Sequence, residues 1–81
     1  MNAWKYNFVE LATDNLNRIV ELKLNDKPMT DKFRQVHTSK FLNYMGQRGW
    51  ELISFERQRY RGQSIDFVCL LVFKKAVAAQ S

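Results

Sequence analysis

The sequence predicts an α+β domain in which a four-stranded antiparallel sheet, made of two hairpins, carries one helix between them on one face. Two stretches of alternating polar and apolar residues come first, a stretch of helical periodicity follows, and two stretches that favour strands come last. The predicted order is therefore β-β-α-β-β. A chain of 81 residues supports one hydrophobic core, so we place a single domain at residues 1–75 and expect residues 76–81 to fray.

The first hairpin begins with an aromatic strand. Aromatic residues occupy every second position from Trp4 to Phe8 within residues 4–12, which places three rings on one face of an extended chain. Residues 13–17 are rich in Asp and Asn, which favour turns, and the alternation resumes in residues 18–24. The register of this hairpin stays open, because several offsets give acceptable pairs.

A single helix is predicted after Pro28, which ends the second strand because it lacks a backbone N–H. Apolar residues recur at helical spacing from Phe33 onward, and Gly49 suits the position that ends a helix. The sequence allows two starts, one with a cap at residues 30–31 and a later one with a cap at residues 38–39.

The second hairpin joins residues 50–61 to residues 64–74 through a turn at Gly62 and Gln63. With these two residues as the loop, one face holds two pairs of opposite charge and two apolar pairs. Those pairs are Glu51–Lys74, Arg59–Asp66, Ile53–Val72 and Phe55–Leu70. A slip of one residue would separate both charge pairs, so we predict this register.

The last strand is apolar on both of its faces over residues 65–73. A sheet needs such a strand where both sides are covered, and one short helix covers only one side. We therefore predict a homodimer or larger oligomer that packs sheet against sheet. The alternative is a monomer whose first hairpin folds over the second side. The expected interface residues are Phe67, Cys69, Leu71, Phe73 and Leu52.

A short motif connects the helix to the third strand. Residues 41–54 read Phe-Leu-Asn-Tyr-Met-Gly-Gln-Arg-Gly-Trp-Glu-Leu-Ile-Ser. This resembles the Leu-Asn-x-x-Gly-x-x-Gly-Trp-Glu-Leu signature of a family of small bacterial and phage proteins of unknown function. Members open with an aromatic strand similar to residues 4–6 and close with Phe-Lys-Lys or Phe-Lys-Arg, as residues 73–75 do. The chain departs from the family in Met45, where Leu is usual, and in a longer segment before the motif. The resemblance implies a helix packed on an antiparallel sheet and implies no activity.

The same motif has a structural interpretation. Gly49 can adopt the left-handed conformation that closes a helix, and Gly46 lets the last helical turn approach the sheet. Trp50 then covers the junction between helix and strand. We prefer this structural corner to the alternative of a ligand-binding loop.

No constellation of residues in the sequence predicts catalysis. His37 is the only histidine, which is too little for a usual zinc site, and Cys69 lies in the most apolar strand, where an inert buried thiol is expected. The three glycines match no phosphate-binding loop or dinucleotide fingerprint. We therefore predict a protein that is not an enzyme and that binds no metal or cofactor.

Charge indicates where a partner could bind. The chain has a formal net charge of +5, and Arg57, Arg59 and Arg61 alternate along the third strand beside Tyr60. At steps of roughly 7 Å the three arginines suit the phosphates of a nucleic acid. However, Arg59 faces Asp66 in the predicted register, and Tyr60 points to the other face, so the pattern that stacks bases is missing.

We therefore expect a small non-catalytic module that self-associates and binds a protein partner through Arg57, Arg59, Arg61 and Tyr60, as an adaptor, accessory subunit or inhibitor. A nucleic-acid-binding protein that uses the three arginines is the alternative. The lone cysteine and the lack of a signal-like start favour the cytoplasm. The longest apolar run, residues 67–73, is too short to span a membrane.

Overall fold

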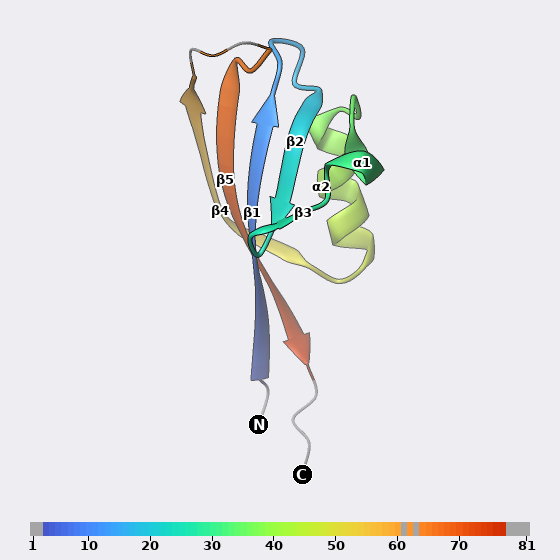
Figure 1. Cartoon of the computed structure of the whole chain (residues 1–81). Coiled ribbons are helices and arrows are strands. Elements are labelled where there is room, and N and C mark those ends of the chain that lie inside the picture. Colours follow the sequence, from blue (N-terminus) through green and yellow to red (C-terminus); the bar gives the residue numbers. More distant parts are fainter. Residues whose placement is uncertain (1–2, 61, 63, 78–81) are drawn as a thin grey trace.

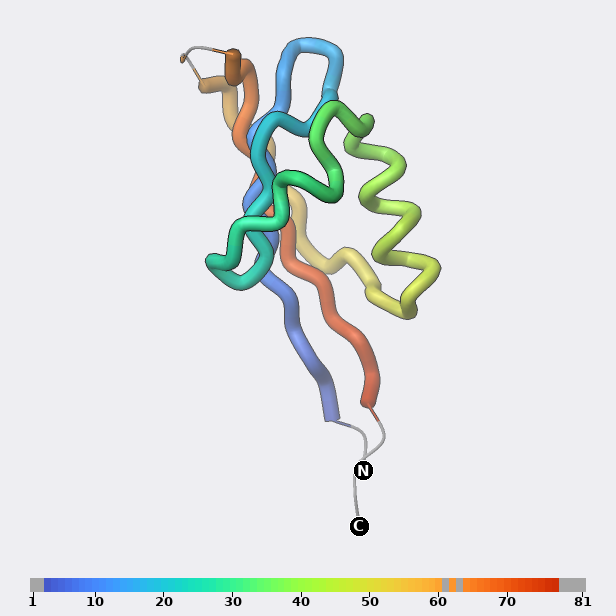
Figure 2. The backbone as a smooth tube through the Cα atoms, turned by 45° about the vertical axis from the view of Figure 1, so that its right-hand side comes forward, coloured from blue at the N-terminus to red at the C-terminus, as the bar shows by residue number. Residues whose placement is uncertain are grey.

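The computed structural model describes residues 3–60, 62 and 64–77. Within these residues, five strands form one antiparallel sheet in the order β3-β2-β1-β5-β4, and two helices lie on one side of it (Figures 1 and 2). The strands are β1 (Ala3–Thr13), β2 (Ile19–Leu24), β3 (Lys27–Pro28), β4 (Glu51–Arg59) and β5 (Phe67–Val77), and the helices are α1 (Thr30–Phe33) and α2 (Thr38–Gln47).

The predicted four-stranded β-β-α-β-β arrangement is wrong, because the chain has a further strand and a further helix. The additional strand β3 follows β2 through a tight turn at Asn25 and Asp26, whose φ angles are 49° and 66°. Asn and Asp tolerate this conformation better than most residues with a side chain. Pro28 does not prevent pairing, because β3 lies at the edge of the sheet and needs hydrogen bonds on one side only.

The predicted helix is broken in two. Gln35 has a φ angle of 65°, and the chain beside it returns to β2, where the Ile19 N–H donates to the Val36 carbonyl at 2.8 Å. A new helix, α2, then begins, capped by the His37 Nδ1 atom, which accepts a hydrogen bond from the Ser39 N–H at 3.1 Å. A helix therefore begins near each of the two starts that the sequence allowed, but the N-cap positions are Met29 and His37, just before the predicted caps.

Strands β1 and β5 pair along their whole length in the middle of the sheet, from the Ala3–Val77 pair to the Thr13–Phe67 pair. The start of β1 and the end of β5 extend beyond the helices as a two-stranded arm (Figure 1). The last residues of β5 are thus paired, whereas residues 78–81 of the predicted tail lie outside the described residues.

The register of the second hairpin is confirmed at one end and wrong at the other. Glu51 pairs with Lys74 as predicted. Ile53 then forms a β-bulge, so that every later residue of β4 faces a partner one position further along β5 than predicted. The expected ion pair between Arg59 and Asp66 is absent from the part of the chain that the structure describes.

The corner between α2 and β4 confirms one predicted glycine role and contradicts the other. Gly49 has a φ angle of 86° and its N–H donates to the Gly46 carbonyl at 3.0 Å, which closes the helix. Trp50 is half-buried against the core, with the Lys75 ammonium 5.7 Å from the centre of its ring. A Cβ atom at Gly46 would meet nothing within 4 Å, so close approach to the sheet does not explain that glycine.

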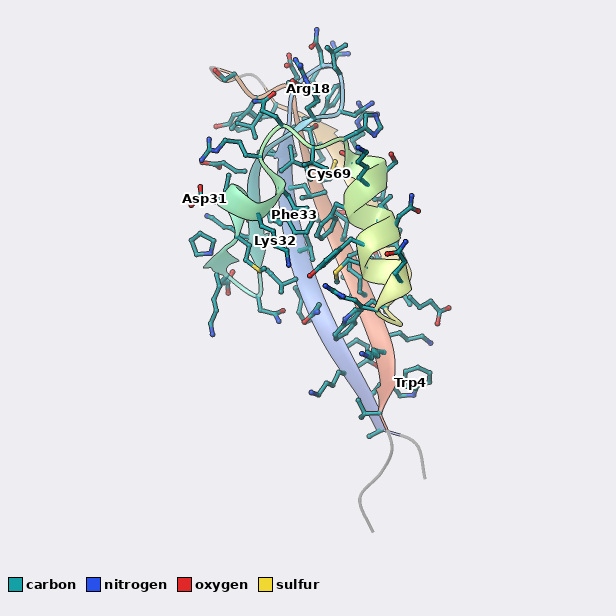
Figure 3. All side chains as sticks on the ribbon, turned by 90° about the vertical axis from the view of Figure 1, so that its right-hand side faces the viewer. Trp4, Arg18, Asp31, Lys32, Phe33 and Cys69 are labelled. Carbon is teal, nitrogen blue, oxygen red and sulfur yellow. The ribbon has the colours of Figure 1, made fainter. Side chains whose placement is uncertain are left out.

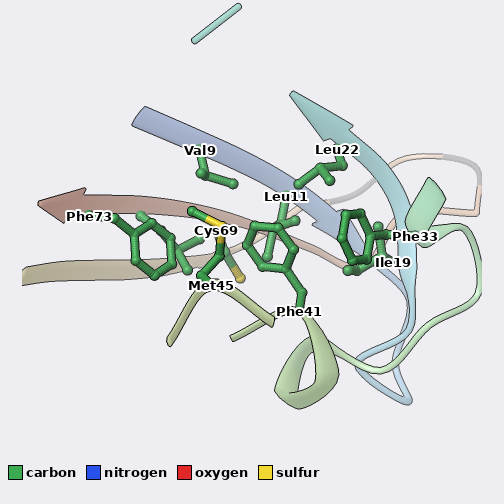
Figure 4. Packing of buried hydrophobic residues seen from close by; sticks show 10 residues of the cluster. Val9, Leu11, Ile19, Leu22, Phe33, Phe41, Met45, Cys69 and Phe73 are labelled. Carbon is green, nitrogen blue, oxygen red and sulfur yellow. The ribbon is translucent and has the colours of Figure 1, made fainter. Parts of the chain in front are cut away.

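The hydrophobic core lies between the helices and the sheet, and Phe41 joins its parts (Figure 4). The Phe41 ring packs edge to face on Phe33 of α1 at 5.1 Å between ring centres and on Phe73 of β5 at 6.1 Å. The buried hydrophobic residues among those described are Val9, Leu11, Ala12, Ile19, Leu22, Phe33, Phe41, Met45, Cys69, Leu71 and Phe73.

The turn between β1 and β2 is organised by Asp14. One carboxylate oxygen accepts the N–H groups of Leu16 and Arg18, each at 2.9 Å, and the other accepts the Arg18 Nε–H at 2.8 Å. Burial acts to raise the pKa of Asp14, but these hydrogen bonds from Arg18 and Leu16, together with the Arg18 charge, outweigh it and lower the pKa below its usual value. The turn is therefore more stable with Asp14 ionised.

Asp14→Asn should lower the free energy of unfolding at pH 7 by about 1 kcal/mol, because a neutral amide oxygen replaces the charged acceptor. A lowered pKa in the folded state means that the stabilisation is complete above the unfolded pKa and is lost as the pH falls through the folded pKa. The difference from wild type should therefore shrink when urea unfolding is measured at pH 3. Asp26→Asn, at an exposed turn position, is the matched control, and a difference for Asp14→Asn that stays constant with pH would contradict this account.

Candidate functional site

Strand pairing sorts the side chains of the sheet onto two faces. The helix side meets α1 and α2 and holds the core, whereas the open face is covered by no described element (Figure 2). The open face consists of every second residue from Trp4 to Ala12 in β1 and from Val68 to Ala76 in β5, together with Glu21, Lys23, Glu51, Ser54, Glu56 and Gln58.

The open face exposes large apolar side chains. Phe8 is 61% exposed and Leu70 46%, and Trp4 and Tyr6 extend the row along the arm. Trp4 lies beyond the helices, near the end of the arm (Figure 3), with the Lys74 ammonium 4.3 Å from its ring centre. A contiguous exposed apolar patch on a small domain indicates an interaction surface.

Charged residues of the strands are also divided between the faces. Every one on the helix side is basic: Lys5, Lys27, Arg57, Arg59 and Lys75. The open face carries four glutamates and two lysines, a net charge of −2: Glu10, Glu21, Glu51, Glu56, Lys23 and Lys74. The excess positive charge of the strands thus lies on the helix side of the sheet.

Strand β4 lies at one edge of the sheet. All nine of its residues are exposed, including Leu52, Ile53 and Phe55. Proteins usually blunt such an edge with charged residues, Pro, a bulge or a covering element. Strand β4 has charged residues and the bulge at Ile53, but it contains no Pro, and the bulge leaves residues 54–59 as a regular strand. The opposite edge is the two-residue strand β3, which ends in Pro28.

A hollow of about 230 Å³ lies between α2 and β4. Its lining residues are Asn17, His37, Thr38, Ser39, Leu42, Phe55, Arg57 and Cys69. Arg57 is held in place there, because its Cζ atom lies 3.7 Å from the centre of the Phe67 ring and its Nη2 atom donates to the Asn17 Oδ1 atom at 3.0 Å. The hollow therefore combines apolar walls with a positioned guanidinium group.

Neither Cys69 nor His37 has the surroundings of a catalytic group. Cys69 lies on the sheet beside α2 (Figure 3) and is 3% exposed. Burial raises the pKa of its thiol more than the Arg57 charge lowers it, so the thiol stays protonated and is a poor nucleophile at neutral pH. The His37 ring caps α2 and its Nδ1 atom lies 2.9 Å from the Ser39 hydroxyl, which is a structural task.

The predicted partner-binding residues are only partly brought together. Arg57 and Arg59 lie on the helix side, opposite Cys69 and Phe67 of β5. Tyr60 follows the strand and is 49% exposed, and Arg61 lies outside the described residues.

The residues predicted for the oligomer interface also have two kinds of environment. Cys69, Leu71 and Phe73 are buried in the core of the chain, whereas Phe67 is half-buried under Arg57 and Leu52 is exposed on β4. A sheet-to-sheet contact over β5 must therefore use the alternate residues Val68, Leu70 and Val72. The sequence signal for this face was the aromatic alternation from Trp4 to Phe8.

The described residues contain no group of three or more His, Cys, Asp or Glu side chains placed to hold a metal ion. None of the helices in the described part of the chain has the length and apolar content needed to cross a bilayer. Two surfaces are candidates for binding a partner: the open face, and the β4 edge with its neighbouring hollow.

Comparison with known proteins gives a family and nothing further. Neither the curated proteins nor the solved structures include a match to the chain. One family model, described as "Domain of unknown function (DUF4177)", matches residues 4–76, a span from the first aromatic residue of β1 almost to the end of β5. The chain therefore belongs to this family of domains of unknown function.

Proposed function

We propose that the domain is a non-catalytic binding module that forms a homodimer through its open face and binds a protein partner with the surface that remains free. The observation that carries this proposal is the exposure of Trp4, Tyr6, Phe8 and Leu70 on one face of the sheet while both helices cover the other. Removing apolar surface of this kind from water is the main favourable term in protein association.

The open face suits a second copy of the same chain in its apolar content and in its charge. Four of its large apolar side chains, Trp4, Tyr6, Phe8 and Leu70, are between 46% and 61% exposed, and a second copy can cover them all. The face carries both signs of charge, so a two-fold axis can set glutamates of one copy near lysines of the other. Such a dimer packs two sheets face to face, which is a standard arrangement.

Phe8→Lys tests the dimer, because it places a charge in the centre of the proposed interface without touching the core. Light scattering behind a size-exclusion column should show weaker association, with a dimer dissociation constant raised roughly thirtyfold or more, as expected for loss of a central apolar anchor. Leu16→Lys is the matched control, since Leu16 is 58% exposed in the β1–β2 turn, away from the open face. Equal masses for wild type and Phe8→Lys at every concentration would contradict the proposal.

Nucleic-acid binding by the helix side is the second candidate, and the concentration of basic residues there favours it. It ranks lower because the aromatic row from Trp4 to Phe8, which could stack on bases, lies on the opposite, acidic face. A labelled oligonucleotide that binds at about 50 mM salt and is released by 500 mM salt would support it. No anisotropy change at the lower salt concentration would remove it.

A further inference from the structure

We propose that the edge of β4 binds an extended, acidic segment of a partner protein, which adds to the sheet as a strand antiparallel to β4. This inference goes beyond the proposed dimer, because it concerns the edge of the sheet and not its open face. Addition of a strand to an exposed edge is a common way for domains to recognise peptides.

The backbone of β4 has hydrogen-bonding groups available for such a strand. The Tyr60 N–H donates to the Asp66 carbonyl at 2.9 Å, which sets the alternation along the β4–β5 ladder. The backbone groups of Gln58, two residues earlier, therefore also form their hydrogen bonds with β5. The N–H and C=O groups of Phe55, Arg57 and Arg59 point the other way, out from the edge of the sheet. Each of these three residues therefore offers one N–H donor and one C=O acceptor to an added strand, at steps of about 7 Å along β4.

The side chains of the same three residues define what the segment should contain. They point to the helix side, and directly paired residues of neighbouring strands share a face. An antiparallel segment therefore places one residue opposite Arg59, a second opposite Arg57 and a third opposite Phe55. Carboxylates suit the first two positions and an apolar side chain suits the third, which gives the pattern acid-x-acid-x-apolar.

Two features of the structure favour an acidic segment over a second copy of β4. The strands contribute no carboxylate to the helix side of the sheet in the described residues, so Arg57 and Arg59 have no counter-charge from that source. Pairing two β4 strands around Phe55 would bring four arginines to the same side of the joint sheet. The hollow beside α2, lined by Leu42 and Phe55, also offers space for the apolar side chain of a segment.

The test uses a fluorescent peptide of seven residues with Glu at positions 2 and 4, Leu at position 6 and Thr elsewhere, added to the full chain and followed by anisotropy. Replacing both Glu by Gln should weaken binding about tenfold, because two cross-strand charge pairs are lost. N-methylation of the backbone nitrogens at positions 2 and 4 should abolish binding, since these N–H groups would bond to β4. Equal binding of the N-methylated peptide, or of the Gln peptide, would overturn the proposal.

Variants of the chain provide the second arm of the test. Arg57→Gln with Arg59→Gln should weaken binding of the Glu peptide about tenfold, whereas Lys23→Gln, which removes a lysine from the open face, should leave it unchanged. Phe8→Lys should also bind the peptide normally, so failure of the dimer and failure of this proposal are distinguishable. An effect of Lys23→Gln equal to that of the arginine variant would overturn the proposal, as would an oligonucleotide that binds while the Glu peptide does not.

Discussion

Phe41→Ala is expected to lower the free energy of unfolding by about 3 to 5 kcal/mol, the usual cost of truncating a buried phenylalanine. The Phe41 side chain is 2% exposed and touches Phe33 and Phe73 through ring edges. Its loss would leave a cavity where α1, α2 and β5 meet. A small domain has a total stability of about 5 to 15 kcal/mol, so this variant should be partly unfolded at modest temperature.

Urea unfolding followed by circular dichroism measures this change. Leu16→Ala is the control, since Leu16 is 58% exposed and its truncation should change stability by less than about 0.5 kcal/mol. A loss below about 1 kcal/mol for Phe41→Ala would show that α2 does not pack on the sheet as described.

Two glycine substitutions in the same segment should have effects of opposite sign. Gly49→Ala should destabilise the domain by about 1 to 2 kcal/mol, because the φ angle of 86° is costly for a residue with a Cβ atom. Gly46→Ala should stabilise it by about 0.5 to 1 kcal/mol, because Gly46 lies inside α2 and a Cβ atom there meets nothing within 4 Å. Thermal unfolding of the two variants beside wild type makes the comparison, and two changes of the same sign would contradict the geometry of this corner.

Local chemistry explains which parts of the fold were predictable from the sequence. The alternation of Trp4, Tyr6 and Phe8 marks β1, and Gly49 marks the end of α2, because each signal acts within a few residues. Strand β3 was missed because Pro28 usually ends strands, and only its position at the edge of the sheet permits pairing. The break at Gln35 was missed because the segment beside it is held by the distant Ile19.

The sequence predicted the strand that carries the candidate site, but not the face of the sheet on which its arginines lie. The alternation of Arg57 and Arg59 identified β4, yet the side on which they lie depends on the bulge at Ile53. No local residue pattern announces that bulge, and an extra residue moves every later side chain to the other face. The same effect separated Arg59 from Asp66 and placed Arg57 and Arg59 on the helix side of the sheet.

The predicted oligomer interface was also assigned without knowing which face of β5 is exposed. Strand β5 is apolar on both faces, so the sequence could not distinguish the face that the helix covers from the face that it leaves exposed. The structure assigns Cys69, Leu71 and Phe73 to the core. The alternate residue Leu70 shares the open face with Phe8, and this is the surface on which the proposed dimer depends.

Sedimentation equilibrium of the wild-type chain over a range of concentrations tests the central claim, association through the open face, most directly. We predict a mass that rises from that of one chain in dilute samples to that of two chains at higher micromolar concentrations, without a further increase. The Phe8→Lys variant should keep the mass of one chain under the same conditions. A wild-type mass of one chain at every concentration, in a sample shown by circular dichroism to be folded, would contradict the account.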